Sequence, residues 1–146
     1  MLAQDALEKL KKACSYRELC QFDVQQKLQK WSIDYYTAQN IIADLISANF
    51  INEERYAKAY VADKVNLNAW GEKKIIYQLK KKHISPQNIE KAIAQIDQKK
   101  YKEAILKLIQ QKNQVFNQLS AKDRKQKVIN FLMNRGFHYH SFKDLL

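Results

Sequence analysis

The feature that most constrains this chain is a threefold repeat of its apolar residues. Each copy contains a triplet at offsets of four and five residues: Val24, Leu28 and Ile33; Ile75, Leu79 and Ile84; Val128, Leu132 and Phe137. The triplets start 51 and 53 residues apart. A period of this length is typical of helical repeat proteins, in which each unit buries its apolar face by stacking on a neighbour. The sequence therefore predicts three units of one plan.

Within each unit the spacing predicts three helices. Apolar residues four apart indicate an amphipathic helix for the triplet, and a second apolar group that follows it indicates another helix. A third helical segment precedes each pair, over about residues 5–16, 52–65 and 99–118. We therefore expect three three-helix repeats, the last with a lengthened first helix. Their predicted bounds are residues 1–50, 51–97 and 98–146.

The corners between helices carry matching signals. Gly136 stands where a helix end needs a left-handed residue, and an apolar residue follows it, as in a Schellman cap. Ser32 and His83 occupy the same place in the other two units. Downstream, Asp34 and Ser85 are suited to cap the next helix, and a proline at the first helical position follows Ser85.

Turn residues are scarce, since the chain has two glycines and one proline. A β-rich fold of this size would need many more of them, so the fold class expected is all-α. Three short-linked units that mostly contact their neighbours form an extended, curved array rather than a ball. We expect bending at the junctions near residues 49–52 and 97–100.

Positive charge increases along the chain. The three predicted units carry net charges of 0, +3 and +8, which together give the formal charge of +11. Such a gradient indicates a polyanion bound mainly by the middle and last units, because neutralising phosphates releases condensed counterions. A merely solvated basic face is the alternative.

The cysteines and the apolar runs indicate a cytoplasmic protein. Cys14 and Cys20 resemble neither a disulfide framework nor a zinc site, and they suit a reducing compartment. Charges occur throughout the first residues and no apolar run reaches 18, so we expect neither a signal peptide nor a membrane contact.

The first candidate contact surface lies on the helix expected over residues 72–82. On a helical wheel Lys73, Lys74, Lys80 and Lys81 fall away from the apolar stripe, with Tyr77 among them. An aromatic ring within a lysine face can stack on a base, or enter a partner's pocket, while the cations meet phosphates. Alternatively, Tyr77 packs against a neighbouring unit.

A second basic set belongs to the third unit: Lys122, Arg124, Lys125, Lys127 and Arg135. Arg124 and Arg135 fall near the apolar stripe of their helix, so these two either contact nucleic acid or lie along the edge of the core.

No pattern in the chain predicts catalysis. Two glycines cannot build a phosphate-binding loop of the usual kind, and neither an activated nucleophile nor a carboxylate pair is present. The His138 and His140 pair has no acidic or cysteine ligand near it in sequence. We therefore expect a protein that is not an enzyme and has no metal or cofactor.

The middle unit resembles the signature of the RecX family over two stretches: residues 51–61, INEERYAKAYV, and residues 70–84, WGEKKIIYQLKKKHI. It departs at His83, where the family usually has glycine, and at Lys64, where it often has arginine. Residues 131–137 are similar to the family's third repeat, and residues 24–33 fit the first more loosely.

This resemblance implies a bacterial cytoplasmic protein of recombination, DNA repair and the SOS response. Such a protein binds the RecA recombinase, lies in the groove of the filament that RecA forms on single-stranded DNA, and restrains filament growth, ATP hydrolysis and strand exchange. We expect a monomer that binds this filament and its single-stranded DNA, with non-specific binding of double-stranded DNA as a further property.

Two other interpretations remain open. Two helices at a tight corner also describe a helix-turn-helix DNA-binding transcriptional regulator. Three non-identical repeats argue against it, and only residues 86–88 offer suitable base-reading side chains at the start of a second helix. A helical-repeat scaffold without salt-dependent DNA affinity is the other alternative.

Overall fold

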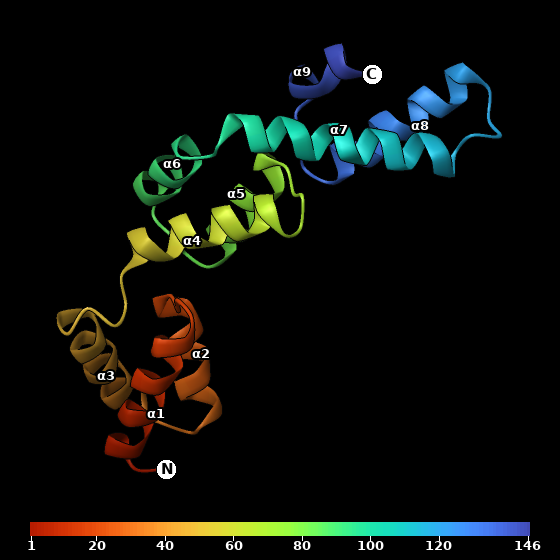
Figure 1. Cartoon of the computed structure of the whole chain (residues 1–146). Helices are drawn as coiled ribbons and strands as arrows, with labels where there is room; N and C mark the ends of the chain where they lie inside the picture. Colours follow the sequence, from red (N-terminus) through yellow and green to blue (C-terminus); the bar gives the residue numbers. More distant parts are fainter.

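The computed structural model describes residues 1–146, and all of its regular structure is helical, as the scarcity of turn residues predicts. The helices are α1 (Ala3–Tyr16), α2 (Gln21–Lys30), α3 (Tyr35–Ser47), α4 (Glu53–Asn66), α5 (Glu72–Lys81), α6 (Pro86–Ala94), α7 (Gln98–Val115), α8 (Ala121–Asn134), α9 (Tyr139–Phe142) and the 3₁₀ turn η1 (Lys143–Leu145). They form an elongated, bent molecule in which the N-terminus lies at one end, the turn between α7 and α8 lies at the other, and the C-terminus lies beside α9 above α7 (Figure 1). The expected curved array is confirmed.

The helices form three groups in chain order: α1 to α3, α4 to α6, and α7 to η1. The third group starts with the longest helix. Helix α7 has 18 residues, whereas α1 and α4 have 14 each. It ends at Val115, earlier than the expected end near residue 118, because the chain must turn before Ser120. The hydroxyl of Ser120 accepts the backbone N–H of Asp123 at 3.2 Å and caps α8. The exact unit boundaries stay a prediction from the repeat.

The corners form as the sequence predicts. Ser32 and His83 both adopt a φ of 59°, and Gly136 adopts 98°. At each corner the following apolar residue donates its N–H back to the preceding helix, as Ile84 does to the Leu79 carbonyl at 3.2 Å. These bonds satisfy carbonyls that a helix end otherwise leaves without a partner. The N-caps at Asp34 and Ser85 are also confirmed.

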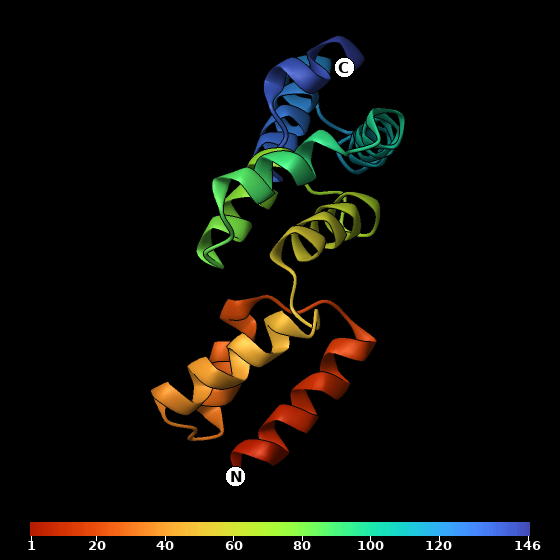
Figure 2. The same cartoon turned by 90° about the vertical axis from the view of Figure 1, so that its left-hand side faces the viewer.

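Two apolar cores hold the molecule together. One lies among α1, α2 and α3 and includes Leu10, Leu28 and Leu45. The other runs through α4 to α9, includes Leu79 and Leu132, and also takes in Cys20 at the start of α2. The second and third groups of helices thus share one core. The first group has its own core, touches the larger one through Cys20, and is connected to it by a short link (Figure 2).

The two glycines of the chain meet at the contact between the second and third groups. A Cβ atom on Gly71 would lie 2.1 Å from the carbonyl carbon of Gly136, and one on Gly136 would lie 2.5 Å from the Cβ of Lys74. The Gly71 N–H donates to the Arg135 carbonyl at 2.9 Å, and the Lys73 N–H donates to the Gly136 carbonyl at 3.0 Å. Glycine is required because backbone touches backbone here.

Side chains reinforce this contact. The Tyr101 hydroxyl of α7 accepts the Glu72 N–H at 3.0 Å. The Arg135 guanidinium donates to the carbonyls of Ala69, at 3.0 Å, and of Asn68. The first N–H groups of α5, which have no partner inside their own helix, are thus satisfied by α7 and by the turn after α8.

Replacing Gly71 by alanine should push the start of α5 away from the turn after α8. The added methyl group has no room against the Gly136 backbone, so we expect the free energy of unfolding in urea to fall by about 2–3 kcal/mol. A second variant, Tyr101→Phe, keeps the volume and removes only one acceptor, and it should cost about 1 kcal/mol. An unchanged unfolding midpoint in both variants would show that the contact does not stabilise the fold.

Candidate nucleic-acid interface

Helix α5 presents the lysine and tyrosine face that the sequence predicts. Ile75 and Leu79 of this helix are fully buried, and this fixes the opposite side outward. On that side Tyr77 is 60% exposed, and Lys73 and Lys81 lie one turn to either side of it. The alternative that Tyr77 packs against a neighbouring unit is therefore wrong.

The cations of this face have no carboxylate partners. Lys73, Lys80 and Lys81 are exposed and form no ion pair. The Lys81 ammonium lies 5.5 Å from the centre of the Tyr77 ring. An exposed ring with unpaired cations around it can stack on a base while the ammonium groups meet the adjoining phosphates.

The fourth predicted lysine of α5 has a different environment. Lys74 is half-buried, and its ammonium lies 4.4 Å from the centre of the Trp70 ring. The Lys64 ammonium of α4 lies 4.8 Å from the same ring. Sequence reasoning missed Lys64 as a neighbour of this face, because the pairing depends on how residues 67–71 carry Trp70 back across the end of α4.

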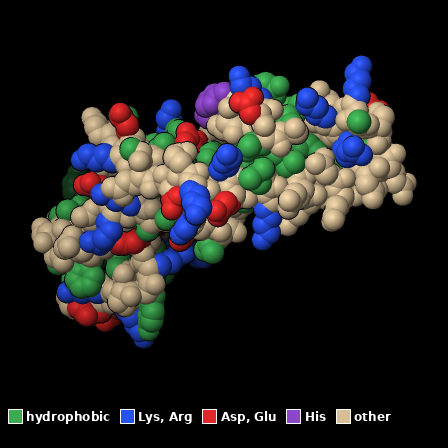
Figure 3. Space-filling model, turned by 45° about the horizontal axis from the view of Figure 1, so that its top comes forward, with side chains coloured by type: hydrophobic (Ala, Val, Ile, Leu, Met, Phe, Trp, Pro, Cys, Tyr) green, Lys and Arg blue, Asp and Glu red, His purple; other side chains and the backbone are tan.

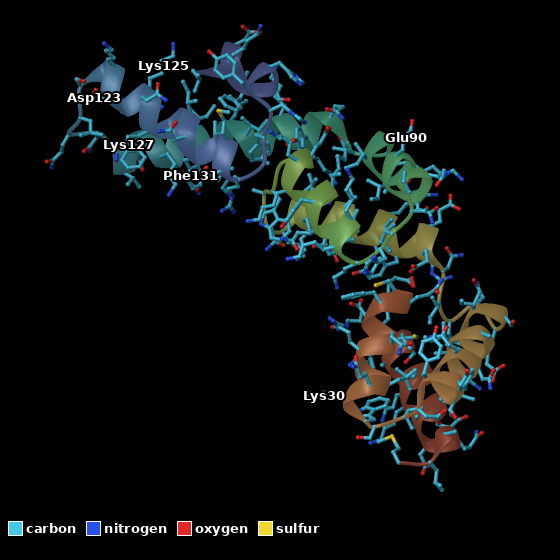
Figure 4. All side chains as sticks on the ribbon, turned by 180° about the vertical axis from the view of Figure 1, so that it is seen from behind. Lys30, Glu90, Asp123, Lys125, Lys127 and Phe131 are labelled. Atoms are coloured by element: carbon cyan, nitrogen blue, oxygen red, sulfur yellow. The ribbon has the colours of Figure 1, made fainter.

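The second predicted basic set does not form one surface. Lys127 lies one turn from Phe131, whereas Arg124 and Lys125 border a separate hollow beside Leu146. Figure 4 shows Phe131 and Lys125 on opposite edges of the α8 arm. Lys122 is exposed in the first turn of α8. The structure therefore separates cations that are close together in sequence.

Arg135 stabilises the fold instead of presenting a free cation on the surface. Its guanidinium holds the carbonyls before Gly71 and lies 5.5 Å from the centre of the Phe131 ring. The Lys112 ammonium lies 4.3 Å from the same ring. Of the two alternatives for Arg135, the structure shows the one at the edge of the core. On the face that Figure 3 shows, separate Lys and Arg side chains project from the end of the molecule formed by α7 and α8, among mostly uncharged atoms.

Polar contacts join the first group of helices to the second. The Lys82 ammonium lies 2.6 Å from Asp23, and the Arg55 guanidinium pairs with Glu18. The Gln21 N–H, at the start of α2, donates to the Glu53 carboxylate at 3.2 Å. In the backbone, residues 48–52 are the only connection between the two groups, and these side-chain contacts add to it.

The Lys82–Asp23 pair also perturbs an ionisation. Burial by itself would raise the pKa of the Asp23 carboxyl. Hydrogen bonds from the Lys82 ammonium and from Cys20 outweigh burial and hold this pKa below its ordinary value of 3.8. Because the pKa is lowered in the folded state, the pair stabilises the structure above pH 3.8 and loses this effect as the pH falls through the lowered value.

A double-mutant cycle can measure this pair. We expect Asp23→Asn and Lys82→Gln to show a coupling free energy of about 1 kcal/mol in urea unfolding at pH 7. The coupling should decline as the pH falls below 3.8, where the unfolded chain takes up the proton first, and it should be lost once the pH has fallen through the lowered pKa of Asp23 in the folded state. The exposed Glu54–Lys58 pair, at 3.2 Å, is the matched control and should give less at pH 7. A coupling at pH 7 no larger than that of the control would contradict the role assigned to the pair.

Comparison with known proteins points to one family. A family model described as the second three-helix domain of RecX matches residues 52–93. The regulatory protein RecX of Streptococcus uberis is 31% identical over 130 residues, which are 88% of this chain and 49% of that protein. RecX of Clostridium botulinum strain Eklund 17B is 31% identical over 125 residues, which are 84% of this chain and 58% of that protein. This chain spans about half the length of these relatives.

Solved structures show the same fold. The crystal structure of RecX from Lactobacillus salivarius is 26% identical, with a TM-score of 0.79, and the match covers 97% of this chain and 94% of that one. A second crystal structure, of a regulatory protein RecX, is 23% identical with a TM-score of 0.87 and is matched over 71% of its length. No helix of this chain combines the length and apolarity needed to cross a membrane.

Proposed function

Because this chain belongs to the RecX family, we propose that it binds the RecA recombinase and the single-stranded DNA in its filament, and inhibits filament growth, ATP hydrolysis and strand exchange. It thereby regulates recombination, DNA repair and the SOS response. The protein acts by binding rather than by catalysis, so the ATP chemistry that it restrains belongs to its partner.

The observation that carries this proposal is the exposed face of α5. Tyr77 lies there between Lys73 and Lys81, and no carboxylate pairs with either cation. A filament groove offers phosphates, bases and protein surface together, and a ring among cations can contact all three. The elongated, bent shape supports it, because a curved array offers an extended surface that can follow a helical groove.

The proposal predicts that α5 lysines are needed for inhibition. We expect the wild-type protein, at substoichiometric amounts, to lower the single-stranded-DNA-dependent ATP hydrolysis of the RecA from its own organism. The variant Lys80→Gln/Lys81→Gln should need about tenfold more protein for the same inhibition, since two phosphate contacts are lost. The matched control is Lys11→Gln/Lys12→Gln, an adjacent lysine pair on α1, which should inhibit as the wild type does.

Two results would contradict the proposal. If the wild-type protein leaves RecA hydrolysis unchanged at every ratio while it binds DNA, the RecA role is wrong and a helix-turn-helix DNA-binding regulator becomes the better hypothesis. If the α5 variant and the α1 control inhibit equally, the filament contact lies elsewhere on the molecule.

Tyr77 tests base stacking separately from charge. Removing the ring in Tyr77→Ala should weaken binding to single-stranded DNA by about 1–3 kcal/mol, measured by fluorescence anisotropy with a labelled oligothymidylate. The slope of affinity against salt should stay unchanged, because no cation is lost. Tyr77→Phe keeps the ring and should bind like the wild type. Equal losses in both variants would show that the hydroxyl, rather than stacking, makes the contact.

A further inference from the structure

Residues 1–50, which include α1 to α3, have a net charge of zero, but some of their carboxylates are bound by cations of the second group. Two of these six carboxylates, Glu18 and Asp23, are paired with the Arg55 and Lys82 cations of the second group. A third, Asp34, accepts the Thr37 N–H at the start of α3. Cations of the first group are therefore left without the partners that a formal count assigns to them.

These cations gather around one hollow on α2. Six residues line it: Arg17, Asp23, Gln26, Lys27, Lys30 and Trp31. Arg17, Lys27 and Lys30 form no ion pair, and the one carboxylate among the six is already bound by Lys82. We call this hollow the α2 notch. Figure 4 shows Lys30 on the inner side of the bend.

The α2 notch is continuous with the α5 face. Arg17 and Asp23 also line a second hollow, at the link between the two groups, whose far wall includes Lys64 of α4. The Lys64 ammonium lies against the Trp70 ring, and Lys74 of α5 lies against the same ring. A path of cations and aromatic rings therefore leads from α2 to α5.

We propose that the α2 notch is a second binding site for the phosphate backbone of a single-stranded DNA that is held on the α5 face. This inference rests on the function proposed above and extends its binding site across the link between the first two groups. The net charges of the predicted units indicate a basic region in the middle and last units only. In the structure the basic region also includes part of the first unit, because ion pairs between the units neutralise acidic side chains there.

Single-stranded DNA fits the notch better than a protein surface does. Three unpaired cations line the same hollow as the half-buried Trp31 ring, so the hollow offers groups complementary to both phosphates and a base. The Lys9 ammonium, 5.8 Å from the centre of this ring, adds positive charge beside it. In the hollow at the link, the Asp63 carboxylate would repel a phosphate, but Lys64 lines the same hollow next to it and offsets this charge.

The arrangement also gives the Lys82–Asp23 pair a role in binding. This pair neutralises the one acid of the notch, and it fixes the first group of helices against the C-terminal end of α5. Both binding surfaces then belong to one rigid path. A strand that occupies both of them gains affinity because the second contact is made at high effective concentration.

The test compares two lysine pairs of the same unit. Affinity for labelled oligothymidylates of about 8 and about 30 nucleotides is measured by fluorescence anisotropy over a range of salt concentrations. The notch variant Lys27→Gln/Lys30→Gln should bind the long strand about tenfold more weakly than the wild type, with a salt slope smaller by about 1.4. Its affinity for the short strand should fall much less, because that strand fits on the α5 face. The control, Lys11→Gln/Lys12→Gln, has the same change in net charge and should bind both strands as the wild type does.

Three results would overturn the inference. If the notch variant matches the control on both strands while Lys80→Gln/Lys81→Gln loses affinity, the α2 notch binds no DNA and the proposed function stands. A notch variant that binds DNA normally but no longer inhibits RecA hydrolysis would show a protein contact instead. If the wild type itself binds neither strand, with or without RecA, the proposed function fails first. Because Lys11 and Lys27 are half-buried, the melting temperature of each variant is measured too, and a value equal to that of the wild type shows that the fold is intact.

Discussion

The contact between the Gly71 and Gly136 backbones determines how the larger part of this molecule is built. It brings the start of α5 against the turn after α8 at a distance that no side chain would allow. The hydrogen bonds made there satisfy the N–H groups that open α5. As a result the second and third groups of helices share one core, and the lysine and tyrosine face of α5 is held on a rigid support.

The other contact between units has a more polar character. Lys82–Asp23 and Arg55–Glu18 join the first group of helices to the second, together with a short backbone link and a small apolar contact through Cys20 and Phe22. Ion pairs near the surface weaken with salt and with acid, whereas backbone hydrogen bonds in a packed contact respond much less. The contact between the second and third units is therefore mainly backbone and core, whereas ion pairs make up a larger part of the contact that holds the first unit. Because these ion pairs use the carboxylates of Glu18 and Asp23, the cations of the α2 notch are left without acidic partners.

Local features of the fold could be predicted because they depend on neighbours in sequence. The left-handed residues at Ser32, His83 and Gly136 follow from the repeat of apolar triplets, and the caps at Asp34 and Ser85 follow from residue type. The α5 face could be predicted in the same way, since a helical period places side chains on one side or the other. The end of α7 could not, because it depends on where the next helix is capped.

Contacts between units explain what sequence reasoning missed. Arg135 looked available for DNA, yet its guanidinium binds backbone carbonyls some 66 residues away in sequence. Lys64 was overlooked, although it shares the Trp70 ring with Lys74. The sequence by itself determined the helices, their corners and the exposed face of α5, because each follows from the period of the chain. Only the tertiary structure decided which charges remain free, because an ion pair between units depends on how the units pack.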